Sequence, residues 1–195
     1  MLASFREDLL VTLPLHSDDG RIFLRRLNLD DLDRNHRWHN DAALYAHLVG
    51  SHRTVSLETE KRWLLQRMEV SETELNLAIC LSSSEEHLGN IYLREIDRAA
   101  GQAEIHLFLG ERNHRGMGYG GASIRCMTAH AFGVLGLNRI VLHVLANNAA
   151  AIKTYLACGF QHLETLNEPV LKGGQPIAVQ VMRMDKRPSG PQQGC

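Results

Sequence analysis

The sequence has few cysteines, and none of them lies in a recognisable pattern. The four cysteines are Cys80, Cys126, Cys158 and Cys195. They have neither the paired spacing nor the nearby histidine pair that zinc sites show, so we expect reduced thiols and no metal. Apolar runs as long as a membrane span are also lacking, and the N-terminal stretch has acidic residues where a signal peptide needs basic ones. These absences predict a cytoplasmic protein without membrane contact.

An excess of charge of one sign is lacking as well. The 21 Lys and Arg residues nearly balance the 22 Asp and Glu residues, which leaves a net charge of −1. This balance argues against a nucleic-acid binder, because no large basic face is indicated. Acidic residues concentrate in the first half, where they could face a cationic substrate, although a solvated acidic surface is the more ordinary interpretation.

One segment, residues 112–163, contains no Asp or Glu at all. It retains the basic residues Arg112, Arg115, Arg125, Arg139 and Lys153. Such a segment favours an anionic ligand. The chain just before it, residues 103–109, alternates as a half-buried strand does. One face of this strand would carry Ile105, Leu107 and Leu109, and the other Glu104, His106 and Phe108.

The strand runs into a basic, glycine-rich loop, RNHRGMGYGG, at residues 112–121. Apolar residues then recur at helical spacing from Ile124 to Leu135. Glycines at a strand-to-helix junction let the backbone approach a ligand closely, and the free N–H groups of the first helical turn bind phosphate. The junction is therefore predicted to bind an anion.

Two common phosphate-binding loops do not fit these residues. A Walker loop ends in Gly-Lys-Ser/Thr, whereas this loop ends in Gly120-Gly121-Ala122 without a lysine. A dinucleotide fingerprint is matched formally by Gly116, Gly118 and Gly121, but no acidic residue follows about 20 residues later to bind the ribose. Both alternatives are excluded.

A third kind of loop fits better. Residues 115–120, RGMGYG, resemble the acyl-coenzyme A loop of the GNAT acetyltransferases. Residues 136–160 resemble the strand and helix that follow it in that family. The matching features there are Asn148 to Ile152, Tyr155, and Gly159-Phe160. The chain is thus identified as a member of the GNAT family, with a match over about residues 20–185.

The resemblance implies an α/β fold in which helices flank a single mixed, mostly antiparallel sheet, the acyl-CoA N-acyltransferase fold. We expect one acetyltransferase domain at residues 1–187 and a disordered tail at 188–195. Local patterns predict strands at 9–15, 21–27, 74–81, 88–97, 103–109, 140–145, 161–166 and 177–184. They predict helices at 28–40, 41–48, 56–68, about 119–133 and 149–157. The last two strands would pair across a Gly173-Gly174 loop.

The resemblance also assigns roles in binding acetyl-CoA. The main chain of Leu107, Phe108 and Leu109 would pair with the pantetheine arm. The pyrophosphate would lie on the N–H groups of Gly116, Met117, Gly118, Tyr119, Gly120 and Gly121. Asn148 would hydrogen-bond the arm from the other side, Arg112 or Arg115 would reach phosphate, and Lys153 would reach the adenosine phosphate.

Acetyl transfer to an amine needs a base for the amine and an acid for the departing thiolate. Tyr155 is the predicted general acid, with a buried core tyrosine as the alternative. Glu104 is the preferred base and His106, on the same face, is the competitor, although both could simply be solvated. His143, on an apolar strand, is predicted to be a core histidine.

These features predict an N-acetyltransferase that moves an acetyl group to a primary amine in a ternary complex. Trp38, Asn40 and Asp41 resemble the family branch of ribosomal-protein N-terminal, spermidine and amino-sugar enzymes, although Trp38 alone is more typical of a core residue. The acceptor would be a protein N-terminus or a small amine. An antibiotic or amino-sugar acetyltransferase, and a non-catalytic acyl-CoA-binding regulatory module, are alternatives. A homodimer is possible.

Overall fold

The computed structural model describes residues 13–187 of the chain. Its strands are β1 (Leu15–His16), β2 (Ile22–Arg26), β3 (Leu75–Leu81), β4 (His87–Asp97), β5 (Gln102–Leu109), β6 (Arg139–Leu145), β7 (Gln161–Thr165), β8 (Val170–Lys172), β9 (Gln175–Ile177) and β10 (Val179–Asp185). Its helices are η1 (Leu29–Asp31), α2 (Leu32–His39), α3 (Ala42–Tyr45), α4 (Leu57–Met68), η2 (Arg112–His114), α5 (Tyr119–Gly133) and α6 (Ala149–Cys158).

Eight of the strands form one sheet in the order β1-β2-β3-β4-β5-β6-β10-β7. Every neighbouring pair in it is antiparallel except β5 and β6, which are parallel. The single parallel pair is joined through α5, because a parallel connection has to cross from one end of the sheet to the other. The predicted mixed, mostly antiparallel sheet is confirmed.

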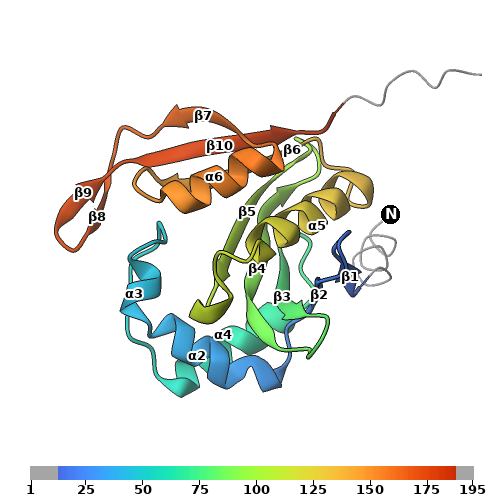
Figure 1. Cartoon of the computed structure of the whole chain (residues 1–195), viewed down its shortest axis with the longest axis vertical. Coiled ribbons are helices and arrows are strands. Elements are labelled where there is room, and N and C mark those ends of the chain that lie inside the picture. The colour runs from blue at the N-terminus through green and yellow to red at the C-terminus, as the bar shows by residue number, and fades with distance from the viewer. Residues whose placement is uncertain (1–12, 188–195) are drawn as a thin grey trace, which may run out of the picture.

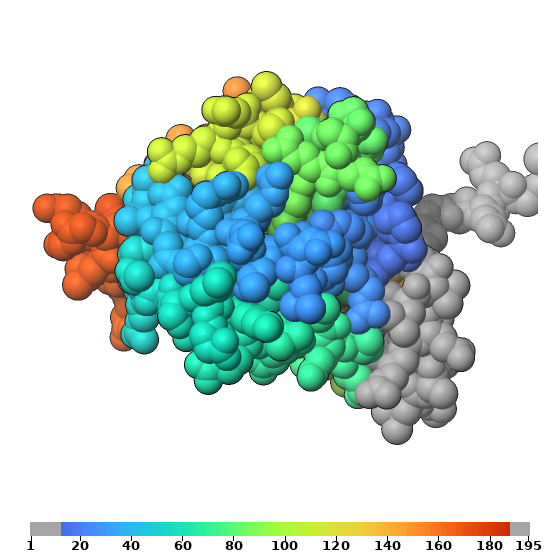
Figure 2. Space-filling model, turned by 90° about the horizontal axis from the view of Figure 1, so that it is seen from below, coloured from blue at the N-terminus to red at the C-terminus, as the bar shows by residue number. Residues whose placement is uncertain are grey.

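Helices cover both faces of this sheet. Along β3, Leu77 and Ile79 join the large core cluster that contains residues of α5, whereas Ala78 and Cys80 pack with Leu64 of α4. Since successive side chains of a strand point to opposite faces, α5 and α4 lie on opposite sides. Figure 1 shows α5 and α6 crossing in front of the strands, with α2, α3 and α4 grouped together at the bottom. Seen from below, the blue segment that contains α2 and the teal segment that contains α4 cover the middle and lower part of the molecule (Figure 2).

Local sequence signals set several of the helix ends. Ser56 caps α4 by accepting a hydrogen bond from the N–H of Thr59, and Asn28 forms a capping box with Asp31 at η1. Gly159 ends α6 with φ = 101°, a left-handed conformation that costs glycine little. These boundaries agree with the predicted ones. The predicted helix 41–48 is shorter, because α3 covers only Ala42–Tyr45.

A buried polar network fixes the first helices to the sheet. Asp31 is 2% exposed and binds Arg25 through two hydrogen bonds of 2.9 and 2.7 Å. Its Oδ1 lies 2.9 Å from Nδ1 of the buried His87. His87 Nε2 is bonded to Asn90 Oδ1 at 2.8 Å, and Asn90 donates to Asn35 Oδ1 on α2 at 2.6 Å. Burial alone would raise the pKa of Asp31, but the hydrogen bonds of Arg25 and then His87 outweigh it and hold that pKa well below its ordinary value.

The C-terminal part differs from the prediction in one respect. β7 and β10 pair as expected, but the segment between them is not a plain loop. It forms a second hairpin, β8 with β9, that turns at Gly173 and Gly174 and projects from the body of the molecule (Figures 1 and 2). The β1–β2 hairpin is confirmed for the part that is described. Most of the strand expected at 9–15 and the tail at 188–195 lie outside the described residues.

Candidate active site

The two parallel strands separate in the middle of the sheet. Pairing between β5 and β6 runs from Gln102 with Arg139 to Glu104 with Val141 and ends there. Beyond this point β5 stays paired with β4 as far as Leu109, and β6 stays paired with β10 over its whole length. The edge of β5 that faces β6 therefore lacks a neighbouring strand at 105–109, and its main chain can pair with an extended ligand. Leu107, Phe108 and Leu109 lie in this open stretch.

The glycine-rich loop lies at the end of the open edge. Gly118 is the N-cap residue of α5, with φ = 85° and no side-chain cap, and Gly116 has φ = 76°. A Cβ built on Gly116 would meet no atom within 4 Å. The first N–H groups of α5 have no acceptor within the helix, and N–H groups at such a position can bind an anion. The arrangement fits the predicted acyl-coenzyme A loop.

Three arginines lie around the loop: Arg112 and Arg115, which the sequence predicts there, and Arg21, which it does not. Arg112 Nη2 lies 2.9 Å from both carboxylate oxygens of Asp41, and Arg115 Nε donates to the carbonyl of Leu109 at 3.0 Å. Both guanidinium groups bind protein groups here, and their phosphate role stays a prediction. Arg21 was missed, yet it donates to the carbonyl of Met117 at 3.0 Å and lies 5.3 Å above the Tyr119 ring. No local signal identifies a residue so far away in the sequence.

Asn148 is the N-cap residue of α6, and Lys153 lies within this helix. Asn148 caps this helix by accepting from the N–H of Ala151, and its Nδ2 donates to the carbonyl of His47 at 3.1 Å. Lys172 of the β8–β9 hairpin binds the same segment as Asn148, the chain that follows α3, with its Nζ 2.6 Å from the carbonyl of Gly50. Lys153 is exposed. The coenzyme roles of Asn148 and Lys153 therefore remain predictions, and for Asn148 the His47 contact would have to break.

Three titratable side chains converge where β5 and β6 separate. His143 Nδ1 lies 2.6 Å from Glu104 Oε1, and His106 Nε2 lies 3.2 Å from the same oxygen. The side chains of Glu104, His143 and His106 are 14%, 32% and 42% exposed. The prediction that His143 is a core histidine is wrong. β6 separates from β5 after Val141, and His143, two residues further along, contacts Glu104 and is partly exposed.

Tyr155 is half-buried on α6, with its ring packed near that of Phe160 at a centroid distance of 6.0 Å. None of the described residues forms a hydrogen bond with its hydroxyl. Burial raises the pKa of Tyr155 to about 12, above the value near ~10 of an ordinary phenol. The hydroxyl therefore stays protonated through the neutral range, although it is a weaker acid than the sequence suggested.

Aromatic residues of α2, α4 and the sheet line the face that carries Glu104. Phe108 lies near the rings of Tyr92 and His39, at centroid distances of 6.5 and 6.1 Å, and His39 also packs edge-on against Trp63 at 4.8 Å. His39 Nδ1 contacts the buried carboxylate of Glu60 at 2.7 Å. This face combines aromatic rings with negative charge, which suits a cationic ligand.

Trp38 is only 2% exposed, which confirms its interpretation as a core residue. A Cβ on Gly110 would lie 2.2 Å from its ring, so the end of β5 passes directly over the indole. A pocket of about 350 Å³ adjoins this contact and is lined by Arg37, Trp38, Asp41, Gly110, Glu111, Arg112 and Asn113. The pocket lies beside the loop that follows β5, and it includes the predicted site residue Arg112.

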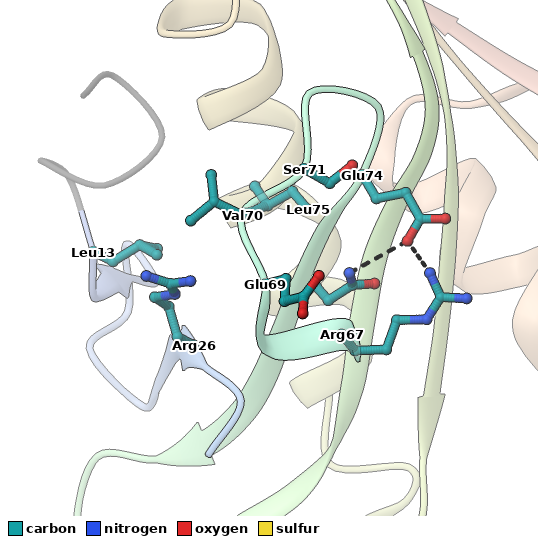
Figure 3. Close-up of a pocket in the computed structure, with 9 residues that line it drawn as sticks. Leu13, Arg26, Arg67, Glu69, Val70, Ser71, Glu74 and Leu75 are labelled. Atoms are coloured by element: carbon teal, nitrogen blue, oxygen red, sulfur yellow. Dashed lines mark hydrogen bonds and ion pairs between the residues drawn. The ribbon is translucent and has the colours of Figure 1, made fainter. Parts of the chain in front are cut away.

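A second pocket lies away from these residues, between the end of α4 and the start of β3 (Figure 3). In Figure 3 the side chains of Arg67 and Glu74 point toward each other and form an ion pair. The volume is only about 30 Å³, enough for about one water molecule. It contains none of the predicted site residues and is too small to hold a substrate.

Comparisons with known proteins agree with this geometry. The acetyltransferase (GNAT) domain family matches residues 21–161. Spermidine N-acetyltransferase from Vibrio cholerae, solved with CoA and spermine, has a TM-score of 0.77 at 22% identity, over 85% of this chain and 95% of that one. A GNAT-family acetyltransferase from Bacillus anthracis has a TM-score of 0.75 at 13% identity, over 89% and 98% of the two chains.

The sequence is also similar to the uncharacterized N-acetyltransferase p20 of Bacillus licheniformis, with 26% identity over 168 residues that cover 86% of this chain and 94% of that protein. The chain belongs to the GNAT acetyltransferase family, and it is an acetyl-CoA-dependent acyltransferase. Within residues 13–187, no group of His, Cys, Asp and Glu residues is arranged to hold a metal ion. In the same part of the chain, no helix is long and apolar enough to cross a membrane.

Replacing Gly118 by valine is expected to weaken coenzyme A binding at least about tenfold. Its φ of 85° is strained for a β-branched residue, and the new Cβ would lie 3.3 Å from Arg21 Nη2. Isothermal calorimetry measures the affinity. Gly133→Val, at the other end of α5, is the control, because a Cβ there meets nothing within 4 Å. Unchanged affinity in a folded Gly118→Val protein would contradict the loop assignment.

Proposed function

We propose that this protein acetylates a primary amine, either a small molecule or a protein N-terminus, by direct attack of the amine on acetyl-CoA in a ternary complex. The observation that carries the proposal is the cluster of Glu104, His106 and His143 at the point where β5 and β6 separate. An amine entering from the aromatic face would meet these groups, and the thioester would arrive along the open edge of β5.

The charge of Glu104 supports an amine acceptor. Partial burial works to raise the pKa of this carboxyl, but hydrogen bonding and charge from His106, and then from His143, lower it overall. Glu104 is therefore ionised at neutral pH, and it offers a negative charge to a cationic amine. On this proposal Tyr155, whose hydroxyl stays protonated, donates the proton that the departing thiolate needs.

The three cysteines within residues 13–187 support direct attack over an acetylated enzyme intermediate. Cys158 contacts the first turn of α5, with its Sγ 3.6 Å from the carbonyl of Gly121. Burial raises the pKa of the Cys158 thiol, although the nearby Arg125 works to lower it. Burial also raises the pKa of Cys80 and of Cys126, each to about 11. Because the thiolate is the nucleophile, thiols that stay protonated are poor acetyl carriers.

Steady-state kinetics with a panel of amines tests the proposal. The panel contains spermidine, glucosamine, an aminoglycoside and a peptide with a free α-amine, and release of free thiol from acetyl-CoA is followed. We expect release that depends on at least one amine, with initial-rate lines that intersect as both substrates are varied. A burst of thiol without any amine, or parallel lines, would indicate an acetylated enzyme instead. Absence of release with every amine would contradict the proposed class of acceptor.

A further inference from the structure

The cluster at the point where β5 and β6 separate contains two histidines, His106 and His143, beside the single carboxylate of Glu104. Glu104 and Val141 form the last pair between β5 and β6, and paired residues of parallel strands share a face. His106 and His143 each lie two residues further along, so they point to the same side as Glu104. Two imidazoles thus approach one oxygen, Oε1 of Glu104, at 2.6 Å for His143 and 3.2 Å for His106.

The shorter contact determines the proton positions. Glu104 is ionised and can only accept a hydrogen bond, so Nδ1 of His143 must carry the proton in the 2.6 Å contact. In the neutral imidazole this leaves a lone pair on Nε2. No described residue forms a hydrogen bond with that nitrogen, and the side chain is 32% exposed. The geometry is that of a base whose second nitrogen is held by a carboxylate, as in other nucleophile and base pairs.

We infer that His143 is the general base of the acetyl transfer and that Glu104 is the residue that positions it. This inference rests on the proposed function. The amine nitrogen forms a bond to the thioester carbonyl carbon while the carbon–sulfur bond breaks. The proton released by the amine goes to Nε2 of His143, and the thiolate takes a proton from the Tyr155 hydroxyl. Exchange with solvent then returns the imidazole and the phenol to their starting states.

An imidazole is a better proton acceptor here than Glu104 itself. A carboxylate whose pKa is lowered holds a proton weakly at neutral pH, whereas a general base works best when its pKa lies near the working pH. The ionised carboxylate instead fixes the tautomer of His143 and stabilises the imidazolium that forms. Sequence reasoning missed this arrangement, because Glu104 and His143 are 39 residues apart and meet only through the β5–β6 register.

Other charged groups face His143 from the neighbouring strands. On β10, Val181 pairs with His143 and Arg183 pairs with Val141, and Arg183 Nε lies 3.4 Å from Asp185. On β4, Arg94 pairs with Glu104 in register, but its guanidinium lies 3.4 Å from Glu74. Both arginines thus have carboxylate partners of their own. On β7, Glu164 pairs with Val181 and so lies on the same face of the sheet as His143.

The experiment compares the pH dependence of turnover in His143→Gln, Glu104→Gln and His106→Gln, using the amine that the wild type acetylates best. We expect His143→Gln to lower kcat by about 10²-fold or more and to remove the acid limb of the profile. Glu104→Gln should lower kcat about tenfold and move that limb to lower pH, because the anion no longer stabilises the imidazolium. His106→Gln should cost less than His143→Gln. His162→Gln, an exposed histidine on β7, is the control.

Chemical rescue supplies a readout that a structural role would not change. Added imidazole should restore part of the turnover of His143→Ala and none of that of Glu104→Gln. The inference is overturned if His143→Gln keeps full turnover, or if Glu104→Gln loses more and imidazole rescues nothing. Calorimetry with coenzyme A confirms that each variant is folded. If His143→Gln does not bind coenzyme A, the pH profile of Glu104→Gln and the imidazole rescue of His143→Ala test the inference instead. A wild type without amine-dependent thiol release would instead contradict the proposed function.

Discussion

Tyr155→Phe is expected to lower kcat about 100-fold while coenzyme A affinity and thermal stability stay close to those of the wild type. The substitution removes only the hydroxyl, for which no described residue is a hydrogen-bond partner, so the half-buried ring can keep its contact with Phe160. What is lost is the proton donor for the departing thiolate. Stopped-flow measurement of thiol release at saturating substrates gives kcat, and calorimetry gives the affinity.

The raised pKa of Tyr155 predicts the basic side of the wild-type pH profile of turnover. With that pKa at about 12, the phenol stays protonated from the neutral range up to about pH 11, so its ionisation should not limit turnover there. The basic side of the wild-type profile should therefore be flat over the range in which the protein is stable. Phe132→Leu, a change in another half-buried ring, is a control for packing. Full turnover in Tyr155→Phe would make Tyr155 a packing residue only.

Asp31→Asn is expected to lower the free energy of unfolding at pH 7 by about 3 kcal/mol, because it leaves a buried charge network without its anion. Asp31 binds Arg25 by two hydrogen bonds and lies 2.9 Å from His87. Its Oδ2 also accepts from the N–H of Asn28 in the capping box. Urea denaturation followed by circular dichroism measures the change. Asp30→Asn, an exposed residue in the same turn, should change stability by less than about 0.5 kcal/mol.

The same network predicts how stability depends on pH. The pKa of Asp31 is lower in the folded than in the unfolded chain, where an aspartate titrates near ~3.9. Its contribution is therefore complete well above that value, and it is lost as the pH falls from there toward the folded pKa. The wild type should lose stability between about pH 5 and pH 2. Asp31→Asn should lose less over that range, and equal slopes in the two proteins would contradict this explanation.

Sequence reasoning worked where the signal was local. The strand alternation before the loop, the caps at Ser56 and Asn28, and the glycine that ends α6 each depend on a few neighbouring residues. The glycine-rich loop could be placed at a strand-to-helix junction for the same reason. The β8–β9 hairpin was missed because three-residue strands carry too little pattern to distinguish them from a loop.

Sequence reasoning failed where residues meet only through the sheet. Arg21 reaches the loop because β2 begins beside the N-terminal end of α5, and Arg112 turns to Asp41 because α3 begins there. The sequence predicts a core position for His143, because β6 is apolar on either side of it, whereas its side chain is 32% exposed and contacts Glu104. None of these contacts leaves a spacing that the sequence could show.

The sequence by itself determined the main helices and strands and the loop at the start of α5, because helix periodicity, strand alternation and glycine positions are set by local backbone geometry. The family and its mixed sheet followed from the resemblance of residues 115–120 and 136–160 to GNAT acetyltransferases. The tertiary structure alone decided which groups share the open face of the sheet. The register of β5 against β6 stops at Glu104 and Val141, and that end point turns His143 from a core position into a partner of Glu104. The physical reason is that the separation of two strands depends on packing across the whole sheet, with α5 and α6 on one face and α2 and α4 on the other.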